Sequence, residues 1–490
     1  MTAPVVRTPL WTEWLALRGR LDVPVVRTGR SRGASLPVPD LVAGLAGALT
    51  SDVAPGDLVV AGEVRGERGP MPSHAAPLVA GELRRAGLRV HVGPVVTTRR
   101  VVDSTQDRAA LAARGAVAVD TESALLASPD GTTVVVRVVT DTPRQRLLSP
   151  ALPARAVRAL ATLRRTAPVL DRWAAAVGER EVVLATPRSF CAGVERAIHV
   201  VESALDRFGA PVHVRRQIVH NRHVVEELER RGAVFVEEAD EVPEGGVVVF
   251  SAHGVAPAVR RTAEERGLRV IDATCPLVWK VHREVGRFAA ADRTVLLIGH
   301  HDHEEVVGTR GEAPDHVVVV ADPEEAARVS VPDPERVSYV MQTTLAVDDA
   351  AETAAVLRER FPALAGPHTD DICYATTNRQ QAVREVAART ELVIVVGSPN
   401  SSNSQRLVEV AEAAGTPAHL VDDVSEVELS WLAGVRRVGI TAGASAPPAL
   451  VDDVVQSLAG LGPVHVREHG DVVEDIAFAV PKELSREVVT

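Results

Sequence analysis

The chain has 490 residues, a length that at roughly 150 residues per domain indicates about three structural units. Its composition is 46% hydrophobic, 24% charged and only 3% aromatic, so Val, Leu and Ala should build the cores of an ordinary soluble globular protein. The net charge of −11 argues against nucleic acid as a partner, and because lysine occurs only at Lys280 and Lys482, a Walker A lysine is excluded and Schiff-base chemistry is disfavoured.

The N-terminal residues 1–20 lack a basic stretch followed by an apolar run, and no apolar segment has the length needed to span a bilayer. We therefore expect a cytoplasmic enzyme without a membrane partner. The three cysteines are an odd number and lie far apart in the sequence, which argues against structural disulfides.

Short apolar runs alternate with amphipathic stretches along the chain, a pattern that predicts α/β units with parallel sheets. The clearest predicted strands are residues 58–61, 182–185, 247–250, 294–298 and 392–396. Residues 147–180 are instead helical, rich in arginine and bracketed by prolines, with few signals of a tight joint. We therefore predict two parts, residues 1–178 and residues 179–490, with a boundary near Glu179.

The front part carries two segments, residues 115–124 and residues 136–141, that resemble the later half of nucleoside phosphorylases and nucleosidases. The resemblance implies that Glu122 binds ribose hydroxyls and that Asp141 serves at the base. Thr121 stands where that family usually has methionine, and only about fifty residues precede the strand at 58–61, which leaves little room for a strand and a Gly-rich phosphate loop. We expect a partial, degenerate phosphorylase-like α/β domain without catalysis of its own.

Each of the three cysteines, Cys191, Cys275 and Cys373, stands at the expected start of a helix. Pro276 is a favoured first helical residue, and Thr376 is a plausible helix cap. Helix N-termini stabilise thiolates and the anionic clusters that thiolates bind. Three unrelated buried thiols would explain the cysteines equally well, so the surrounding residues have to decide.

Short polar loops follow the predicted strands, at the position where open α/β sheets place ligands. Together with the cysteine segments, they resemble 4-hydroxy-3-methylbut-2-enyl diphosphate reductases over about residues 182–480. The motifs that carry the resemblance are Phe190-Cys191-Ala192-Gly193-Val194, Ser251-Ala252-His253-Gly254-Val255, Asp272-Ala273-Thr274-Cys275-Pro276, Ala375-Thr376-Thr377-Asn378-Arg379-Gln380, Asn400-Ser401-Ser402-Asn403-Ser404 and Thr441-Ala442-Gly443-Ala444-Ser445. Several specific motifs in one order weigh more than any short pattern alone.

The resemblance implies a trefoil of three α/β subdomains around one [4Fe-4S] cluster, with one thiolate each from Cys191, Cys275 and Cys373. Since such clusters usually take four cysteines, three would leave one iron open to substrate. A Cys3His zinc site is the alternative, but the wide spacing lacks the short ligand pairs of zinc modules.

The resemblance also implies that histidines and small polar side chains hold the diphosphate of an allylic substrate. The matching residues are His220, His253, His303, Ser401, Ser402, Asn403 and Ser445. Imidazoles and hydroxyls can all donate hydrogen bonds to phosphate oxygens.

The resemblance implies that Glu305 is the proton donor, since the family places a glutamate two residues after the diphosphate-binding histidine, and that Thr343 orients or relays that proton. Reductive loss of hydroxide needs an acid near the leaving oxygen. A solvated carboxylate at a helix start is the plainer interpretation of Glu305. Its neighbours Glu304 and His301 are close enough in sequence to be confused with the functional residues. Met341 replaces a small hydroxyl residue of the family, a change expected to affect packing and not chemistry.

The implied reaction consumes two electrons and two protons, and without a GxGxxG or flavin signature in the matching region the electrons should come from a separate ferredoxin or flavodoxin. Two other functions compete. One is a bifunctional protein whose front domain also cleaves a nucleoside, and the other is a non-catalytic iron-sulfur sensor. A sensor would not need Glu305 or a diphosphate pocket.

Overall fold

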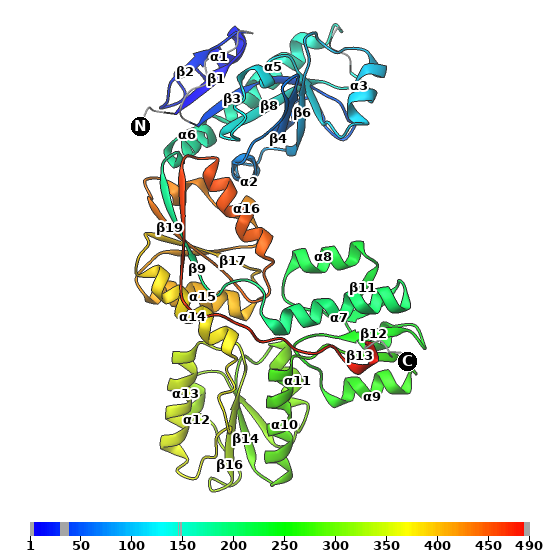
Figure 1. The fold of residues 1–490 in the computed structure, drawn as a ribbon, viewed down its shortest axis with the longest axis vertical. Helices are drawn as coiled ribbons and strands as arrows, with labels where there is room; N and C mark the ends of the chain where they lie inside the picture. Colours follow the sequence, from blue (N-terminus) through cyan, green and yellow to red (C-terminus); the bar gives the residue numbers. More distant parts are fainter. Residues whose placement is uncertain (1–3, 30–38, 146, 148, 485–490) are drawn as a thin grey trace. The chain divides into compact units, whose positions relative to one another are not determined.

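Two compact units make up the chain in this computed structural model, which describes residues 4–29, 39–145, 147 and 149–484 (Figure 1). One unit comprises residues 1–182, 423–438 and 449–467, and the other comprises residues 183–422, 439–448 and 468–490. Two stretches beyond residue 422 thus belong with the front of the chain, so the boundary near Glu179 stays a prediction.

The described part of the first unit contains an eight-stranded mixed sheet with the order β2-β1-β3-β7-β6-β4-β5, in which β8 pairs with β3 and β4. Its strands are β1 Val5–Thr8, β2 Val25–Arg27, β3 Asp40–Ala48, β4 Leu58–Gly66, β5 Gly69–Pro72, β6 Val90–Thr97, β7 Ala118–Asp120 and β8 Thr133–Asp141. All nine residues of β8 are buried, as expected for a Val-rich strand at the centre of a sheet.

The helices of this unit are α1 Trp11–Leu17, α2 Ala76–Arg85, α3 Thr105–Ala112, α4 Ser123–Leu126, α5 Leu152–Arg165, α6 Ala167–Ala176, α16 Pro448–Ala459, and the 3₁₀ helices η2 Val424–Glu426 and η3 Leu429–Leu432. Helix α2 packs closely on residues 424–429. The Glu82 carboxylate accepts a hydrogen bond of 2.9 Å from the Leu429 amide, and Arg85 donates to the Ser425 carbonyl oxygen at 2.8 Å. Direct hydrogen bonds therefore join α2 to residues 424–429. The sequence did not predict this contact, because the bonded residues lie more than 300 positions apart.

The expectation of little room ahead of the strand at 58–61 was wrong as far as strands are concerned. Three strands, β1 to β3, precede it, and β3 alone has nine residues. Small residues fill β3 (DLVAGLAGA), which weakened its strand signal. The expected shortening or loss of the Gly-rich phosphate loop stays a prediction, since residues 30–38, ahead of β3, lie outside the described residues.

The later part of the chain forms three further sheets, with the orders β11-β10-β12-β13, β15-β14-β16 and β18-β17-β19-β9-β20. Their strands are β9 Arg180–Ala185, β10 Val212–Arg215, β11 Ala233–Val236, β12 Val247–Phe250, β13 Arg269–Asp272, β14 Thr294–Ile298, β15 Val317–Val320, β16 Val337–Met341, β17 Leu392–Val396, β18 Ala418–Val421, β19 Arg437–Ala442 and β20 Val464–His469. The pairs within the first two sheets, and the pair β17–β18, are parallel. Three α/β subdomains with parallel strands confirm the predicted fold class.

Helices connect these strands, as parallel pairing requires. They are α7 Ala192–Phe208, α8 Arg222–Arg230, α9 Pro257–Glu265, α10 Pro276–Ala290, α11 Glu304–Arg310, α12 Pro323–Arg328, α13 Val347–Arg360, α14 Tyr374–Ala387 and α15 Ser402–Ala413, with 3₁₀ turns η1 Ala239–Glu241 and η4 Lys482–Leu484. None of the helices within the described residues has both the length and the apolar composition that a bilayer crossing requires.

Candidate active site

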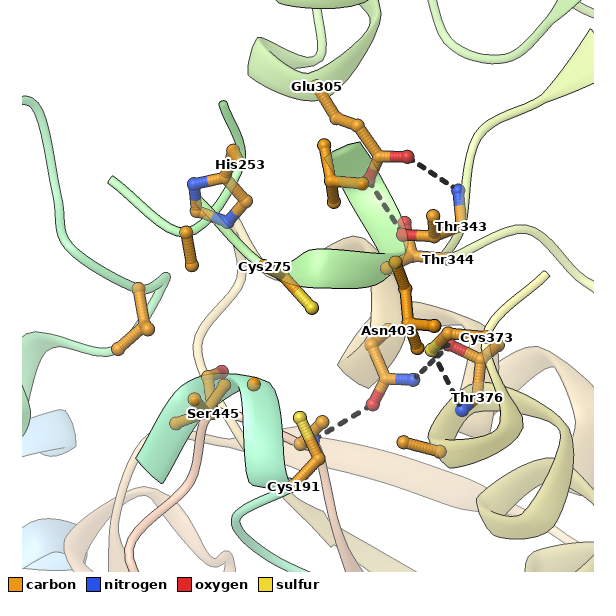
Figure 2. A pocket seen from close by; sticks show the side chains of 18 of the residues that line it. Cys191, His253, Cys275, Glu305, Thr343, Thr344, Cys373, Thr376, Asn403 and Ser445 are labelled. Carbon is orange, nitrogen blue, oxygen red and sulfur yellow. Dashed lines mark hydrogen bonds between the residues drawn. The ribbon is translucent and has the colours of Figure 1, made fainter. Parts of the chain in front are cut away.

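A single cavity is lined by loops that follow strands of all three later sheets (Figure 2). Every residue assigned to the site from the sequence lines this one cavity. They are Cys191, Cys275, Cys373, His220, His253, His303, Glu305, Thr343, Ser401, Ser402, Asn403 and Ser445. The structure thus brings the complete set together, while the individual roles stay predictions.

The three cysteines are unpaired, and each is the residue that caps the N-terminus of a long helix. Cys191 precedes α7, Cys275 precedes α10 and Cys373 precedes α14, which confirms the predicted setting. The Sγ atom of Cys373 accepts a hydrogen bond from the Thr376 amide at 3.3 Å. Free amides and the positive end of a helix dipole favour a negative charge on sulfur.

Burial opposes a negative charge on these sulfurs as long as no positively charged group is bound to them. It raises the pKa of Cys275 to about 12, and the nearby sulfurs of Cys191 and Cys373 add to the shift. Burial likewise raises the pKa of Cys373 to about 11, although hydrogen bonds from Thr376 oppose it. Three thiols gathered in one buried place therefore need a positively charged group to be deprotonated together, as happens when thiols bind a metal centre.

Gly193 keeps space open beside two of the three sulfurs. A Cβ atom on Gly193 would lie 2.8 Å from Sγ of Cys275 and 3.8 Å from Sγ of Cys191, so only glycine leaves that space open. Among the residues that the structure describes, no three His, Cys, Asp or Glu side chains converge closely enough to hold one metal ion. The arrangement therefore fits an iron-sulfur cluster better than a Cys3His zinc ion, whose ligands lie within about 2.3 Å of the metal.

Three histidines form a compact group in the same cavity. The rings of His220 and His253 stack with their centroids 4.1 Å apart, and His303 meets both rings edge-on. Burial and the neighbouring imidazoles lower the pKa of His220 to about 2 and that of His303 to about 3. The Nδ1 atom of His303 accepts a hydrogen bond from the Glu305 amide at 3.2 Å, so its Nε2–H remains as the donor.

Glu304 and Glu305 are neighbours in sequence but differ in position. Glu304 does not line the cavity and lies behind His253, with Oε2 3.6 Å from the imidazole Nδ1. Burial would raise the pKa of Glu304, but His253 and then Arg216 and Arg215 lower it below its ordinary value. His301 is exposed and pairs with Glu325 at 3.0 Å. Of the acids in this loop, only Glu305 lines the cavity.

The Glu305 side chain is buried, and its residue is only 2% exposed, so the interpretation as a solvated carboxylate is wrong. The Thr343 amide donates to Oε1 at 2.7 Å, and the Thr343 hydroxyl donates to Oε2 at 2.8 Å (Figure 2). Burial raises the pKa of Glu305 despite these two bonds. A carboxyl group whose pKa is raised is better suited than an ordinary glutamate to act as an acid near neutral pH.

The opposite wall of the cavity is the N-terminus of α15, where Ser401 caps the helix. Asn403 connects two neighbouring loops, since Nδ2 donates to the Thr376 hydroxyl at 3.4 Å and Oδ1 accepts from the Ala444 amide at 3.0 Å. Ser445 donates to the His220 carbonyl oxygen at 2.9 Å. Hydroxyl and amide donors at a helix N-terminus, beside three imidazoles, form a site for an anion.

Comparison with known proteins agrees with this geometry. A sequence model of the LytB protein family matches residues 182–459, which is more than half of the chain and includes all three cysteines. The chain belongs to the LytB family. A model of the phosphorylase superfamily matches residues 41–128, so the family resemblance of the front domain is confirmed as well.

Relatives with a known activity cover this LytB-family chain from about residue 180 onward. A 4-hydroxy-3-methylbut-2-enyl diphosphate reductase of Leifsonia xyli is 58% identical over 312 residues, 64% of this chain and 93% of that protein. The enzyme of the same name from Streptomyces coelicolor is 56% identical over 310 residues, 63% of this chain and 92% of that protein. The solved structure of the corresponding reductase from Plasmodium falciparum matches with a TM-score of 0.60 at 35% identity, covering 63% of this chain and 97% of that one.

Some residues of the LytB-family site escaped the sequence analysis. Phe478 lines the cavity from residues 470–481, a stretch without helix or strand. Thr344 and Tyr374 line it as well, and their only signal was adjacency to Thr343 and Cys373. Met341 does not line the cavity and packs against a hydrophobic cluster of the β14–β16 sheet, in agreement with an effect on packing alone.

The front domain has a cavity of its own, of about 870 Å³, and both Glu122 and Asp141 line it. The buried guanidinium of Arg108, on α3, forms an ion pair with Oδ2 of Asp141, and the Thr140 hydroxyl donates to Oδ1 at 2.7 Å. Glu122 accepts a hydrogen bond from the Thr121 hydroxyl, at the position where the related enzymes usually have methionine. Both oxygens of Asp141 are thus engaged by the protein itself.

Proposed function

We propose that this LytB-family chain removes the hydroxyl group of (E)-4-hydroxy-3-methylbut-2-enyl diphosphate in the non-mevalonate route, producing isopentenyl and dimethylallyl diphosphates. In the balanced reaction, the substrate takes up two electrons and two protons. The allylic C–O bond breaks, its oxygen leaves as water, and one proton ends on carbon. The supporting observation is the convergence of three cysteines, three histidines and one buried glutamate in a single cavity.

The cysteines would hold one [4Fe-4S] cluster through their three sulfurs, with Gly193 leaving the necessary space. When bound, such a cluster supplies one-electron transfer and, with only three thiolates, one iron open to substrate. The helix N-termini behind Cys191, Cys275 and Cys373 contribute positive potential that favours an anionic centre.

The diphosphate would bind among His220, His253 and His303, with Ser401, Ser402, Asn403 and Ser445 completing the donors. Each imidazole can donate to a phosphate oxygen, and the arriving negative charge favours protonation of groups that are neutral beforehand. The apolar side chains of Val219, Leu277 and Phe478 line the remaining wall, which suits a five-carbon chain and keeps water away from it.

Glu305 would supply a proton to the leaving oxygen, because it is buried, retains its proton more readily than an ordinary glutamate and lines the cavity. Thr343 holds both carboxyl oxygens, which fixes the direction in which the acid points. Thr343 is therefore assigned the orienting role.

The electrons would come from a separate carrier such as ferredoxin or flavodoxin. We place the activity in the cytoplasm, where thiols such as these three unpaired cysteines remain reduced.

Anaerobic purification followed by an assay with a chemically reduced viologen dye tests the proposed reaction. Dye oxidation should require the allylic diphosphate, with two electrons consumed for each product molecule. The matched control is the same diphosphate without its hydroxyl group, which should oxidise no dye. Iron-loaded protein that leaves the hydroxylated substrate unchanged would contradict the proposal.

A further inference from the structure

Each helix that begins at a cavity cysteine carries a positively charged side chain in its second turn. These residues are Arg196 on α7, Lys280 on α10 and Arg379 on α14. Lys280 is one of only two lysines in the chain. None of the three lines the cavity, so substrate binding does not account for them.

Arg196, on the helix of Cys191, reaches the loop of Cys275. Its Nη1 atom donates to the carbonyl oxygens of Ala273 at 3.0 Å and Thr274 at 3.1 Å, the two residues that directly precede Cys275. Its Nε atom donates to the Ala479 carbonyl oxygen at 2.7 Å, next to Phe478 of the cavity wall.

Lys280, on the helix of Cys275, reaches the segment ahead of Cys373. Its Nζ atom donates to the carbonyl oxygens of Thr369 and Asp370, each at 2.7 Å, and lies 3.0 Å from a carboxylate oxygen of Asp371. The Asp371 side chain is fully buried and accepts the Met341 amide at 3.0 Å. Lys280 therefore anchors a segment that continues directly into the third cysteine.

Arg379, on the helix of Cys373, reaches back to the loop of Cys191. Its Nη2 atom donates to the carbonyl oxygens of Ser189 at 2.8 Å and Phe190 at 3.2 Å, immediately ahead of Cys191. The guanidinium is completely buried and pairs with Glu474 at 3.0 Å. Together, the three side chains link the Cys191, Cys275 and Cys373 loops in a closed ring.

We propose that Arg196, Lys280 and Arg379 form a cyclic clamp that fixes the three cysteine loops relative to one another, so that their sulfurs are held at cluster spacing. This inference rests on the proposed cluster. The loops come from separate sheets, and rigid spacing between them needs bonds that cross from one to the next. Each link supplies two carbonyl hydrogen bonds from a charged donor, and such bonds are stronger than neutral ones.

Much of the charge of the clamp is balanced within the protein. Lys280 lies 3.0 Å from Asp371, and Arg379 pairs with Glu474 at 3.0 Å. The links therefore act through their hydrogen bonds to the carbonyl oxygens that precede the cysteines. Each link is therefore a positioning residue that acts through the loops and does not touch the substrate.

The rate at which the anaerobic, cluster-loaded full chain loses iron to a ferrous chelator tests the clamp. Lys280→Met should raise this rate by about tenfold, since two charge-assisted hydrogen bonds are lost. Arg283→Met removes a positive charge from the exposed face of the same helix and is the matched control, with an unchanged rate expected. Lys280→Arg, which keeps the charge and the donors, should restore most of the retention.

A double variant tests whether the links form a ring. With one link removed, the other two still connect all three loops; with two removed, one loop is free. The rate for Arg196→Met combined with Lys280→Met should therefore exceed the product of the two single effects, whereas independent local effects would simply multiply. The melting temperature of the cluster-free protein, measured in parallel, separates loss of the clamp from general unfolding.

The outcomes separate this inference from the proposed function. A wild-type chain that binds no iron would overturn the proposed cluster and the clamp with it. A wild-type chain that holds iron, together with Lys280→Met and double variants that release it at the wild-type rate, would overturn the clamp alone. Faster release that Lys280→Arg fails to restore, in step with a lower melting temperature, would also overturn it.

Discussion

In the front cavity Asp141 and Asp120 each face a buried arginine, whereas Glu305 in the C-terminal cavity bonds only to the neutral groups of Thr343. The Asp120–Arg137 pair is 2.8 Å apart and almost completely buried. In the front cavity, charge is therefore balanced within the protein. In the C-terminal cavity, burial raises the pKa of Glu305, although the hydrogen bonds from Thr343 and the imidazoles of His253 and His282 act to lower it.

The comparison shows that residue type alone does not reveal chemistry. Asp141 and Glu305 both occupy positions that a family resemblance marks as functional, and both line cavities of similar size. Their immediate partners differ, and a buried ion pair is as well suited to structure as to catalysis. We expect the C-terminal cavity to be catalytic and the front cavity to be degenerate.

Replacing Glu305 should produce the largest effect on turnover. Glu305→Gln keeps the size of the side chain and its bond from the Thr343 amide but removes the acid, so turnover should fall by about a hundredfold or more while cluster content and substrate binding persist. Anaerobic kinetics with the reduced dye, alongside iron analysis, measure both quantities. Near-normal turnover would place the proton source elsewhere, for example on His303.

The pH dependence of stability should also show that the pKa of Glu305 is raised in the folded protein. Because burial raises its pKa above the ordinary 4.5, folding favours the protonated form. This contribution is fully present below pH 4.5 and is lost as the pH rises through the folded-state pKa. The cluster-free Glu305→Gln variant should therefore gain stability relative to wild type as the pH rises, measured by urea unfolding at several pH values. A pH-independent difference would show that Glu305 is ionised as readily in the fold as outside it.

Removing the front domain should change reductase turnover less than replacing Glu305 does. We predict that a chain of residues 179–490 keeps its reductase activity but melts at a lower temperature, because residues 424–429 lose their hydrogen bonds with Glu82 and Arg85 on α2. The full-length double variant Glu82→Gln, Arg85→Met is the control, since it weakens the same bonds without a deletion. Loss of turnover in a soluble, cluster-loaded truncation would assign the front domain a structural or regulatory role.

Substitutions in the front cavity should have the smallest effect on reductase turnover. The full chain should cleave no member of a nucleoside panel, with or without phosphate, because the buried Arg108 guanidinium pairs with the Asp141 carboxylate. Arg108→Met, which frees that carboxylate, should leave reductase turnover unchanged. Nucleoside cleavage by the wild-type chain would restore the bifunctional interpretation.

Local pattern was enough to predict much of this molecule. The predicted strands at 247–250, 294–298 and 392–396 coincide with β12, β14 and β17, because continuous Val-rich runs are typical of buried parallel strands. Most cavity residues lie in short polar motifs that follow a strand, and the resemblance of these motifs to a known family made them predictable. Cys373 instead lies in the segment between α13 and α14. The same patterns did not predict β3, because its alanines and glycines give a weak strand signal although the strand is mostly buried.

Contacts between distant segments could not be predicted in this way. Arg379 lies in a recognised motif, but its bond to Ser189 joins residues 190 positions apart. The attachment of Leu429 to Glu82 and the entry of Phe478 into the cavity wall have the same character. Such contacts depend on how the subdomains pack against one another. The hydrophobic periodicity of a single helix or strand carries no information about that packing.

Metal analysis combined with Mössbauer spectroscopy of the anaerobically prepared full chain tests whether the three cysteines hold an iron-sulfur cluster. We predict four irons per chain in one [4Fe-4S] cluster, lost when Cys191, Cys275 or Cys373 is replaced by alanine. Stoichiometric zinc without iron would contradict it.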